Sequence, residues 1–94
     1  MSQQQVEHNE AESCYELATP EGTALAAYQI KGDVIAFTHT EVPEAMEGQG
    51  IGGALIAGAL ADVRRRGLVA LPLCSFVRHY VETHPEVQDL LAQR

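Results

Sequence analysis

Apolar and polar positions alternate through the first part of the chain, and this alternation predicts short antiparallel strands. Residues 6–9 and 13–17 flank a polar tip and are typical of a hairpin. Residues 23–30 form the next predicted strand, after a turn that contains Pro and Gly. A second tight turn leads into a strand over 34–42, whose apolar start indicates burial on both faces. These segments predict a meander of three or four strands.

The spacing of the apolar positions changes after residue 50. Residues four apart are apolar and should share one helix face: Ile51, Leu55, Ala59 and Val63. This spacing predicts a helix over 51–66 with a wide buried stripe, ended by Gly67 in the left-handed conformation.

The remainder of the chain predicts one more strand and a second helical region. The apolar segment 68–73 is typical of a buried parallel strand. Residues 76–83 have helical spacing, and the following His84-Pro85 should interrupt the helix before a last turn or two over 86–92. The element order therefore predicts an α+β fold, an α/β layer in one domain over residues 1–94, with residues 1–4 disordered.

Composition and charge narrow the classes of function. The chain has 94 residues, of which 46% are hydrophobic and 20% charged, as is ordinary for a soluble domain. No apolar run approaches the roughly 18 residues that span a bilayer, so we expect no membrane association. The net charge of −7 argues against nucleic acid and suits a cationic substrate such as an amine.

The cysteines and histidines do not indicate a disulfide framework or a metal site. Cys14 and Cys74 are far apart in the chain, which favours a reducing cytoplasm as the location. The four histidines lack the ligand spacing of a metal site: His8, His39, His79 and His84.

A glycine-rich loop precedes the main predicted helix and carries the strongest chemical signal. Its glycines are Gly48, Gly50, Gly52 and Gly53. Without Cβ atoms the backbone can approach a ligand closely, and the free N–H groups of a first helical turn attract phosphate or pyrophosphate. A flexible loop, or tight packing of the helix on the sheet, is the alternative explanation.

Two common phosphate-binding motifs do not fit this loop. Gly48, Gly50 and Gly53 match the dinucleotide pattern G-x-G-x-x-G, but the next predicted strand ends in Leu73-Cys74 rather than in an acidic residue. A P-loop would require Gly-Lys followed by Ser or Thr, which the chain lacks.

The segment Glu47-Gly48-Gln49-Gly50-Ile51-Gly52 instead resembles the coenzyme-binding motif of GNAT-type N-acetyltransferases. Further segments resemble the small GNAT-like family in the same order: His8-Asn9, Tyr15-Glu16-Leu17, His39-Thr40-Glu41-Val42-Pro43, Pro72-Leu73-Cys74-Ser75-Phe76-Val77 and Tyr80-Val81-Glu82-Thr83-His84-Pro85-Glu86. The resemblance implies a minimal GNAT fold, a mixed and mostly antiparallel sheet with a splayed parallel strand pair and flanking helices. It also implies acetyl-coenzyme A as cofactor.

The resemblance implies a set of cofactor-binding residues. The strands 34–42 and 68–73 would be the splayed pair, with their carboxyl ends facing the thioester. The residues expected to bind the cofactor are Val42, Gln49, Gly50, Ile51, Gly52, Gly53, Cys74 and Arg78, with Arg78 a candidate for its 3′-phosphate. Glu47 departs from the family, which generally carries Arg or Gln at that position.

Four residues are candidates for the chemistry. Cys74 follows a strand and precedes a helix N-terminus, where a thiolate is stabilised, although cysteine at such a place can equally be a small buried residue. Tyr80 aligns with the family's tyrosine that protonates the departing thiolate. His39 and Glu41 lie on one face of a strand and are candidates for a general base.

These features together predict an enzyme that transfers an acetyl group from acetyl-coenzyme A to a primary amine of a small molecule or a protein. The alternative is a coenzyme A-binding or sensing module without turnover. We expect a monomer or a weak homodimer.

Overall fold

The computed structural model describes residues 6–48 and 50–92; residues 1–4, for which we expect disorder, and Gln49 lie outside them. Four strands occupy the first part of the chain: β1 (Val6–Asn9), β2 (Cys14–Thr19), β3 (Gly22–Lys31) and β4 (Val34–Glu41). Two short 3₁₀ helices lie in this part: η1 (Glu10–Glu12) between β1 and β2, and η2 (Glu44–Met46) after β4. The predicted meander is confirmed, with four strands.

The second part contains two α-helices, one strand and a 3₁₀ helix. They are α1 (Ile51–Arg65), β5 (Val69–Pro72), α2 (Ser75–Glu82) and η3 (Pro85–Leu90). Gly67 has a φ of 73° and ends α1 as predicted. The final helical turns after His84-Pro85 are 3₁₀ rather than α.

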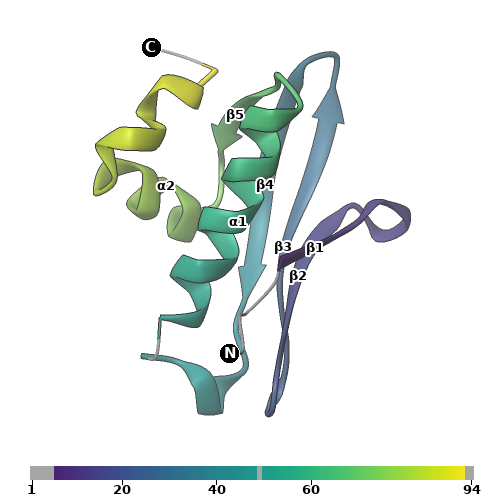
Figure 1. The fold of residues 1–94 in the computed structure, drawn as a ribbon, viewed down its shortest axis with the longest axis vertical. Helices are drawn as coiled ribbons and strands as arrows, with labels where there is room; N and C mark the ends of the chain where they lie inside the picture. Colours follow the sequence, from purple (N-terminus) through teal and green to yellow (C-terminus); the bar gives the residue numbers. More distant parts are fainter. Residues whose placement is uncertain (1–5, 49, 93–94) are drawn as a thin grey trace.

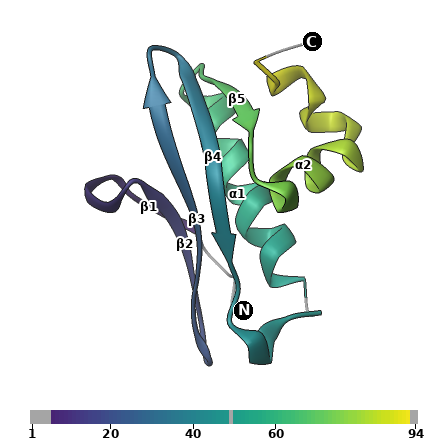
Figure 2. The ribbon, with the colours of Figure 1, turned by 180° about the vertical axis from the view of Figure 1, so that it is seen from behind.

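The strands form one five-stranded sheet in the order β1-β2-β3-β4-β5. The first four strands are antiparallel neighbours, and β5 pairs parallel to β4. The long helix α1 lies in front of β3 and β4 in Figure 1 and behind them in Figure 2. This is the mixed sheet with flanking helices that the resemblance implies.

The core lies between α1 and one face of the sheet. The four apolar residues at four-residue spacing along α1 are all buried, whereas the neighbouring Ala54 is half-buried. Opposite them lie the buried side chains of the strands: Tyr15, Leu17, Ala24, Ala26, Tyr28, Ile35 and Phe37. The helix α2 adds Val77 and Val81 to this core.

The other face of the sheet explains why one burial prediction is wrong. Val34 and Ala36 are only half-buried, although the apolar run at the start of β4 predicted burial on both faces. Figure 2 shows β3 and β4 toward the viewer with no described helix over them. In β5 likewise only Ala70 is fully buried.

The parallel strand pair separates after four residue pairs. The register runs from Val34 opposite Val69 to Phe37 opposite Pro72. The backbone N–H groups of Leu73 and Cys74 then both donate to the Phe37 carbonyl, at 3.1 and 2.9 Å. Beyond this point β4 continues beside β3 alone, while the chain after β5 turns into α2. This is the splayed pair that the resemblance implies.

A β-bulge in β4 lies where β4 and β5 separate. After the bulge, the side chains of β4 that face α1 are the even-numbered ones instead of the odd-numbered ones. Phe37 pairs with Tyr28 and His39 with Ala27, so Thr38 is an extra residue in β4. Thr40 consequently pairs with Ala26, whose side chain is buried under α1. Side chains alternate along a strand, so Thr40 lies on the α1 face and its two neighbours on the open face.

Candidate functional site

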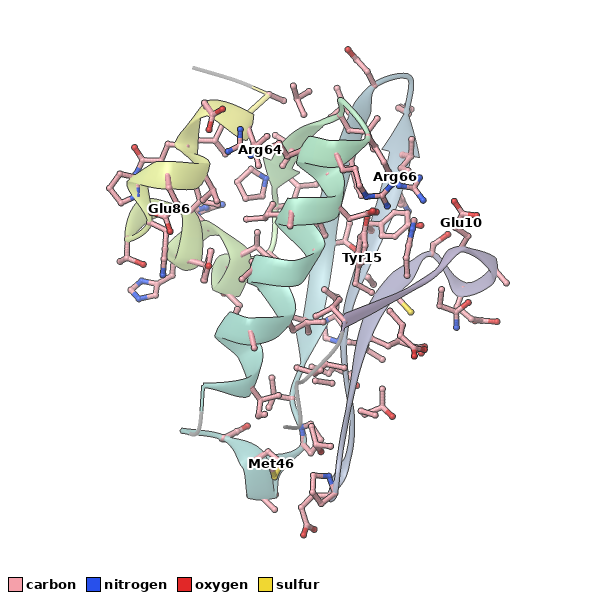
Figure 3. The ribbon with its side chains drawn as sticks, in the orientation of Figure 1. Glu10, Tyr15, Met46, Arg64, Arg66 and Glu86 are labelled. Atoms are coloured by element: carbon pink, nitrogen blue, oxygen red, sulfur yellow. The ribbon has the colours of Figure 1, made fainter. Side chains whose placement is uncertain are left out.

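A hollow of about 400 Å³ opens where β4 ends and α1 begins. Thr40 and Val42, at the end of β4, line this hollow. It is also lined by the turn after η2 and by the first residues of α1. Phe76 of α2 contributes the side formed by the second helix. Met46, labelled in Figure 3, marks this end of the molecule.

The first turn of α1 presents unpaired backbone N–H groups to the hollow. The first intrahelical hydrogen bond runs from the Ala54 N–H to the Gly50 carbonyl, at 3.0 Å. The N–H groups of residues 51–53 precede it and have no acceptor within the helix, and the described residues provide no side-chain cap. Such a helix end is suited to hold an anion.

Left-handed backbone explains two of the loop glycines. Gly48 and Gly50 have φ values of 83° and 80°, a conformation that side chains with a Cβ disfavour. A Cβ added to either would meet no atom within 4 Å, so their backbone conformation alone calls for glycine.

Close packing explains a third glycine. Gly52 is helical and buried, and a Cβ added there would overlap the ring of Phe76. Gly53 is less constrained, since its added Cβ would lie 3.9 Å from the Tyr80 ring, an ordinary contact. The alternative of tight packing therefore applies to Gly52, with a helix rather than the sheet as the neighbour.

Cys74 is the N-cap residue of α2 and is not among the residues that line the hollow. Its sulfur is 3.3 Å from the Thr40 hydroxyl oxygen across the splayed strands. Burial raises the pKa of the Cys74 thiol, but hydrogen bonding with Thr40 and the amides of Val77 and Phe76 outweighs it and leaves that pKa below its ordinary value. The site thus makes the Cys74 thiol easier to ionise than an ordinary cysteine.

Tyr80 lies two turns into α2, against the first turn of α1. Its ring stacks on His84, with centroids 3.8 Å apart, and it lines a second hollow of about 340 Å³ between α1 and η3. Burial, followed by the charge of Glu86, raises the pKa of Tyr80, so the phenol keeps its proton at neutral pH. Tyr80 does not line the hollow at the glycine loop.

His39 and Glu41 lie on the open face of the sheet. The His39 Nε2 atom is 2.7 Å from a Glu41 carboxylate oxygen, and both side chains are exposed. The structure therefore brings this pair together, but on the side of β4 opposite Thr40 and Val42.

The remaining predicted cofactor residues divide into those that line the hollow and those that do not. Val42, Ile51 and the glycines 50, 52 and 53 line it. Arg78 is exposed on α2 and does not. Gln49 lies outside the described residues. Thr40, Met46 and Phe76 line the hollow but were missed from the sequence, because the bulge and the turn that direct them inward have no local signature.

Basic side chains gather at the far end of α1. Both terminal nitrogens of Arg64 lie 2.9 Å from the carboxylate of Asp89 in η3, and Arg66 pairs with Asp62 and Glu10. Figure 3 shows Arg64 and Arg66 at the opposite end of the helix from Met46. These arginines therefore join elements together, in addition to the capping role that their position in the last turn predicts.

The described residues offer a phosphate at the hollow chiefly backbone N–H groups, with Thr40 as the uncharged polar side chain among those that line it. Among residues 6–48 and 50–92, no Lys or Arg lines it, whereas Glu47 does. The free amides and the left-handed glycines fit a pyrophosphate, and the apolar Val42 and Ile51 fit the uncharged arm of a coenzyme.

Two other kinds of site are absent from the described part of the chain. Its side chains include no group of three or more His, Cys, Asp or Glu residues that could hold a metal ion. None of its helices is long and apolar enough to cross a membrane.

Comparison with known proteins gives a consistent result. No curated protein sequence matches the chain. The NMR structure of a GCN5-like protein from Staphylococcus aureus is similar over 100% of this chain and 93% of its own, with a TM-score of 0.75 and 25% sequence identity. Residues 14–90 match the family described as GCN5-related N-acetyltransferases. The chain therefore belongs to the GCN5-related N-acetyltransferase family, whose fold it has.

Proposed function

We propose that the protein binds acetyl-coenzyme A at the glycine loop and transfers its acetyl group to a primary amine. The observation that carries this proposal is the meeting of three features at one end of the sheet. The unpaired amides of α1 and Thr40 at the end of β4 line the same hollow, and across the separating strands the Cys74 sulfur lies 3.3 Å from the Thr40 hydroxyl oxygen.

The chain's own groups divide the task of binding. The N–H groups of residues 51–53 would hold the pyrophosphate, assisted by the positive end of the α1 dipole. Val42, Ile51 and Met46 offer apolar surface to the pantetheine arm. When bound, the coenzyme supplies the acetyl group as an activated thioester.

The pKa values of Cys74 and Tyr80 are shifted in opposite directions, which suits different roles. The lowered pKa of Cys74 favours a thiolate, a nucleophile, whereas the raised pKa of Tyr80 keeps a proton available for donation. Tyr80 lies about 9 Å further along the α2 axis than Cys74. Its ring neighbours Gly53, which lines the hollow, although Tyr80 itself lines the second hollow.

The pair of His39 and Glu41 is proposed as the base for the acceptor. Glu41 orients the His39 ring through their hydrogen bond, and the free ring nitrogen can accept a proton from an ammonium group. Because the pair is exposed on the open face, the acceptor would approach from the side of the sheet opposite α1. The overall charge of −7 favours a cationic acceptor.

Turnover assays test this proposal. Purified protein is incubated with acetyl-coenzyme A and a panel of polyamines, amino sugars and lysine peptides, and thiol release is recorded. We expect release that depends on one acceptor class and falls in a His39→Ala variant. An acetyl adduct found by mass spectrometry on Cys74 would support its nucleophilic role, and full activity of Cys74→Ala would remove it.

A coenzyme A-binding or sensing module without turnover is the second candidate. The observation that favours it is Glu47, an acidic residue that lines the hollow at a position where the resemblance implies Arg or Gln. Tight binding without thiol release from any amine would support this candidate over the enzyme.

A further inference from the structure

The Thr40 hydroxyl is the side-chain partner of the Cys74 sulfur. The backbone of Cys74 is held in place by hydrogen bonds on both sides. The Cys74 N–H donates to the Phe37 carbonyl at 2.9 Å, and the Cys74 carbonyl accepts from the Arg78 N–H at 2.9 Å. With the backbone fixed from both sides, rotation about the Cα–Cβ bond is the main freedom of the sulfur. The Thr40 hydroxyl, 3.3 Å away, favours one rotamer.

The bulge at Thr38 is what makes this contact possible. Without the extra residue, the alternation that buries Phe37 would turn His39 toward α1 and Thr40 toward the open face. The bulge also coincides with the point where β4 leaves β5, so the hydroxyl reaches across the gap between the two strands.

A hydroxyl at this place can serve both states of the sulfur. It accepts a hydrogen bond from the thiol and, after rotation of its own O–H, donates one to the thiolate. The hydrogen bond to the charged form is the stronger of the two, so the hydroxyl favours ionisation of Cys74. His39 and Glu41 of β4 pair with each other on the open face of the sheet, away from Cys74. The charged residues of α2 and its histidine are all exposed to solvent: Arg78, His79 and Glu82.

We propose that Thr40, which lines the hollow, is a positioning residue that fixes the Cys74 sulfur next to its own hydroxyl and stabilises the thiolate by donating a hydrogen bond. The use made of that thiolate rests on the proposed acetyl transfer, but the pairing of the two side chains does not. The hydrogen-bonding influence on the pKa of Cys74 is consistent with this role.

The reactivity of Cys74 toward iodoacetamide measures the effect without any acyl transfer. The experiment uses a Cys14→Ala background, so that Cys74 is the single cysteine of the chain. Alkylation rates are recorded from pH 5 to 10 for this background and for Thr40→Val and Thr40→Ser. Thr38→Val is the matched control, because the Thr38 hydroxyl bonds to the Ala27 carbonyl instead.

Thr40→Val should raise the midpoint of the alkylation profile by about one pH unit, the effect of one lost hydrogen bond to a charged group. Thr40→Ser should recover most of that shift, and Thr38→Val should leave the profile unchanged. Equal midpoints for the background, Thr40→Val and Thr40→Ser would overturn the proposal. So would a shift in Thr38→Val as large as that in Thr40→Val.

The outcome is independent of the proposed function. A protein that releases no coenzyme A thiol from any acceptor can still show the shift, and an active enzyme can lack it. Circular dichroism of each variant shows whether it folds. If Thr40→Val does not fold, Thr40→Ala replaces it with the same expected shift, and an unshifted profile there overturns the proposal equally.

Discussion

Two glycines of α1 provide a test that separates coenzyme binding from stability. Gly52 lies in the first turn, where a Cβ would overlap the Phe76 ring, and Gly58 lies in the middle of the helix. A Cβ on Gly58 would lie 2.7 Å from the Cβ of Val6 in β1. Each position is changed to alanine, so the chemical perturbation is the same.

The neighbours of the two positions differ in their freedom to move. Phe76 is 41% exposed and can rotate away, at a cost of about 1 kcal/mol that offsets the gain of about 1 kcal/mol for alanine over glycine in a helix. Val6 is branched at Cβ and its strand is paired to β2, so it cannot move away from an alanine at position 58. Overpacking should therefore destabilise Gly58→Ala by about 2 kcal/mol, while the higher helix propensity of alanine stabilises it by about 1 kcal/mol. We therefore expect unchanged stability for Gly52→Ala and a loss of about 1 kcal/mol for Gly58→Ala.

Coenzyme binding should respond in the opposite order. The new methyl of Gly52→Ala and the displaced Phe76 ring both enter the hollow, so the affinity for coenzyme A should fall at least about tenfold. Gly58→Ala should retain the affinity of the unchanged protein. Urea unfolding and calorimetric titration measure the two quantities. Unchanged affinity for coenzyme A in Gly52→Ala, or a fall in affinity in Gly58→Ala alone, would refute the claim that the hollow binds the coenzyme.

Three further predictions test the network at the far end of α1 and the turn that precedes the helix. The buried Tyr15 hydroxyl donates to Asp62 at 2.7 Å, so Tyr15→Phe should cost about 2 kcal/mol in urea unfolding; an unchanged midpoint would argue against that bond. Burial and then Arg66 lower the pKa of His8 below 6.5, so its protonation opposes folding, and stability should fall as pH drops below about 6.5. His8→Gln should flatten that pH dependence in thermal melts, and an identical slope would contradict it. Gly50→Ala should cost about 1 kcal/mol through its left-handed φ, with Gly50→Asn recovering most of it.

Local patterns were sufficient to predict most of the fold. The alternation before residue 42 and the four-residue spacing from Ile51 to Val63 reflect burial against a neighbouring layer, which is what sets the two periods. Gly67 ends α1 and the turn at 31–33 separates two strands, because Gly67 and Gly32 have left-handed backbone conformations that most other residues disfavour.

The site was less predictable, because pairing between distant segments creates it. The extra residue Thr38 is defined only by the register of β4 against β3, and it decides that Thr40 rather than His39 faces the hollow. Phe76 has the helical spacing of a core residue, but it lies over Gly52 and remains partly exposed.

The sequence also could not predict how many faces of β4 are buried. An apolar run is equally compatible with one covered face or two, and the number of covering layers depends on elements elsewhere in the chain.

The most direct test of the account is an NMR titration of ¹⁵N-labelled protein with acetyl-coenzyme A. The unpaired amides of residues 51–53 and the amide of Cys74 should shift at submillimolar coenzyme, while that of Asp62 at the far end of α1 should not. Millimolar coenzyme that leaves the amides of residues 51–53 unchanged, or that shifts residues around Asp62 instead, would contradict the central claim that the glycine loop binds acetyl-coenzyme A.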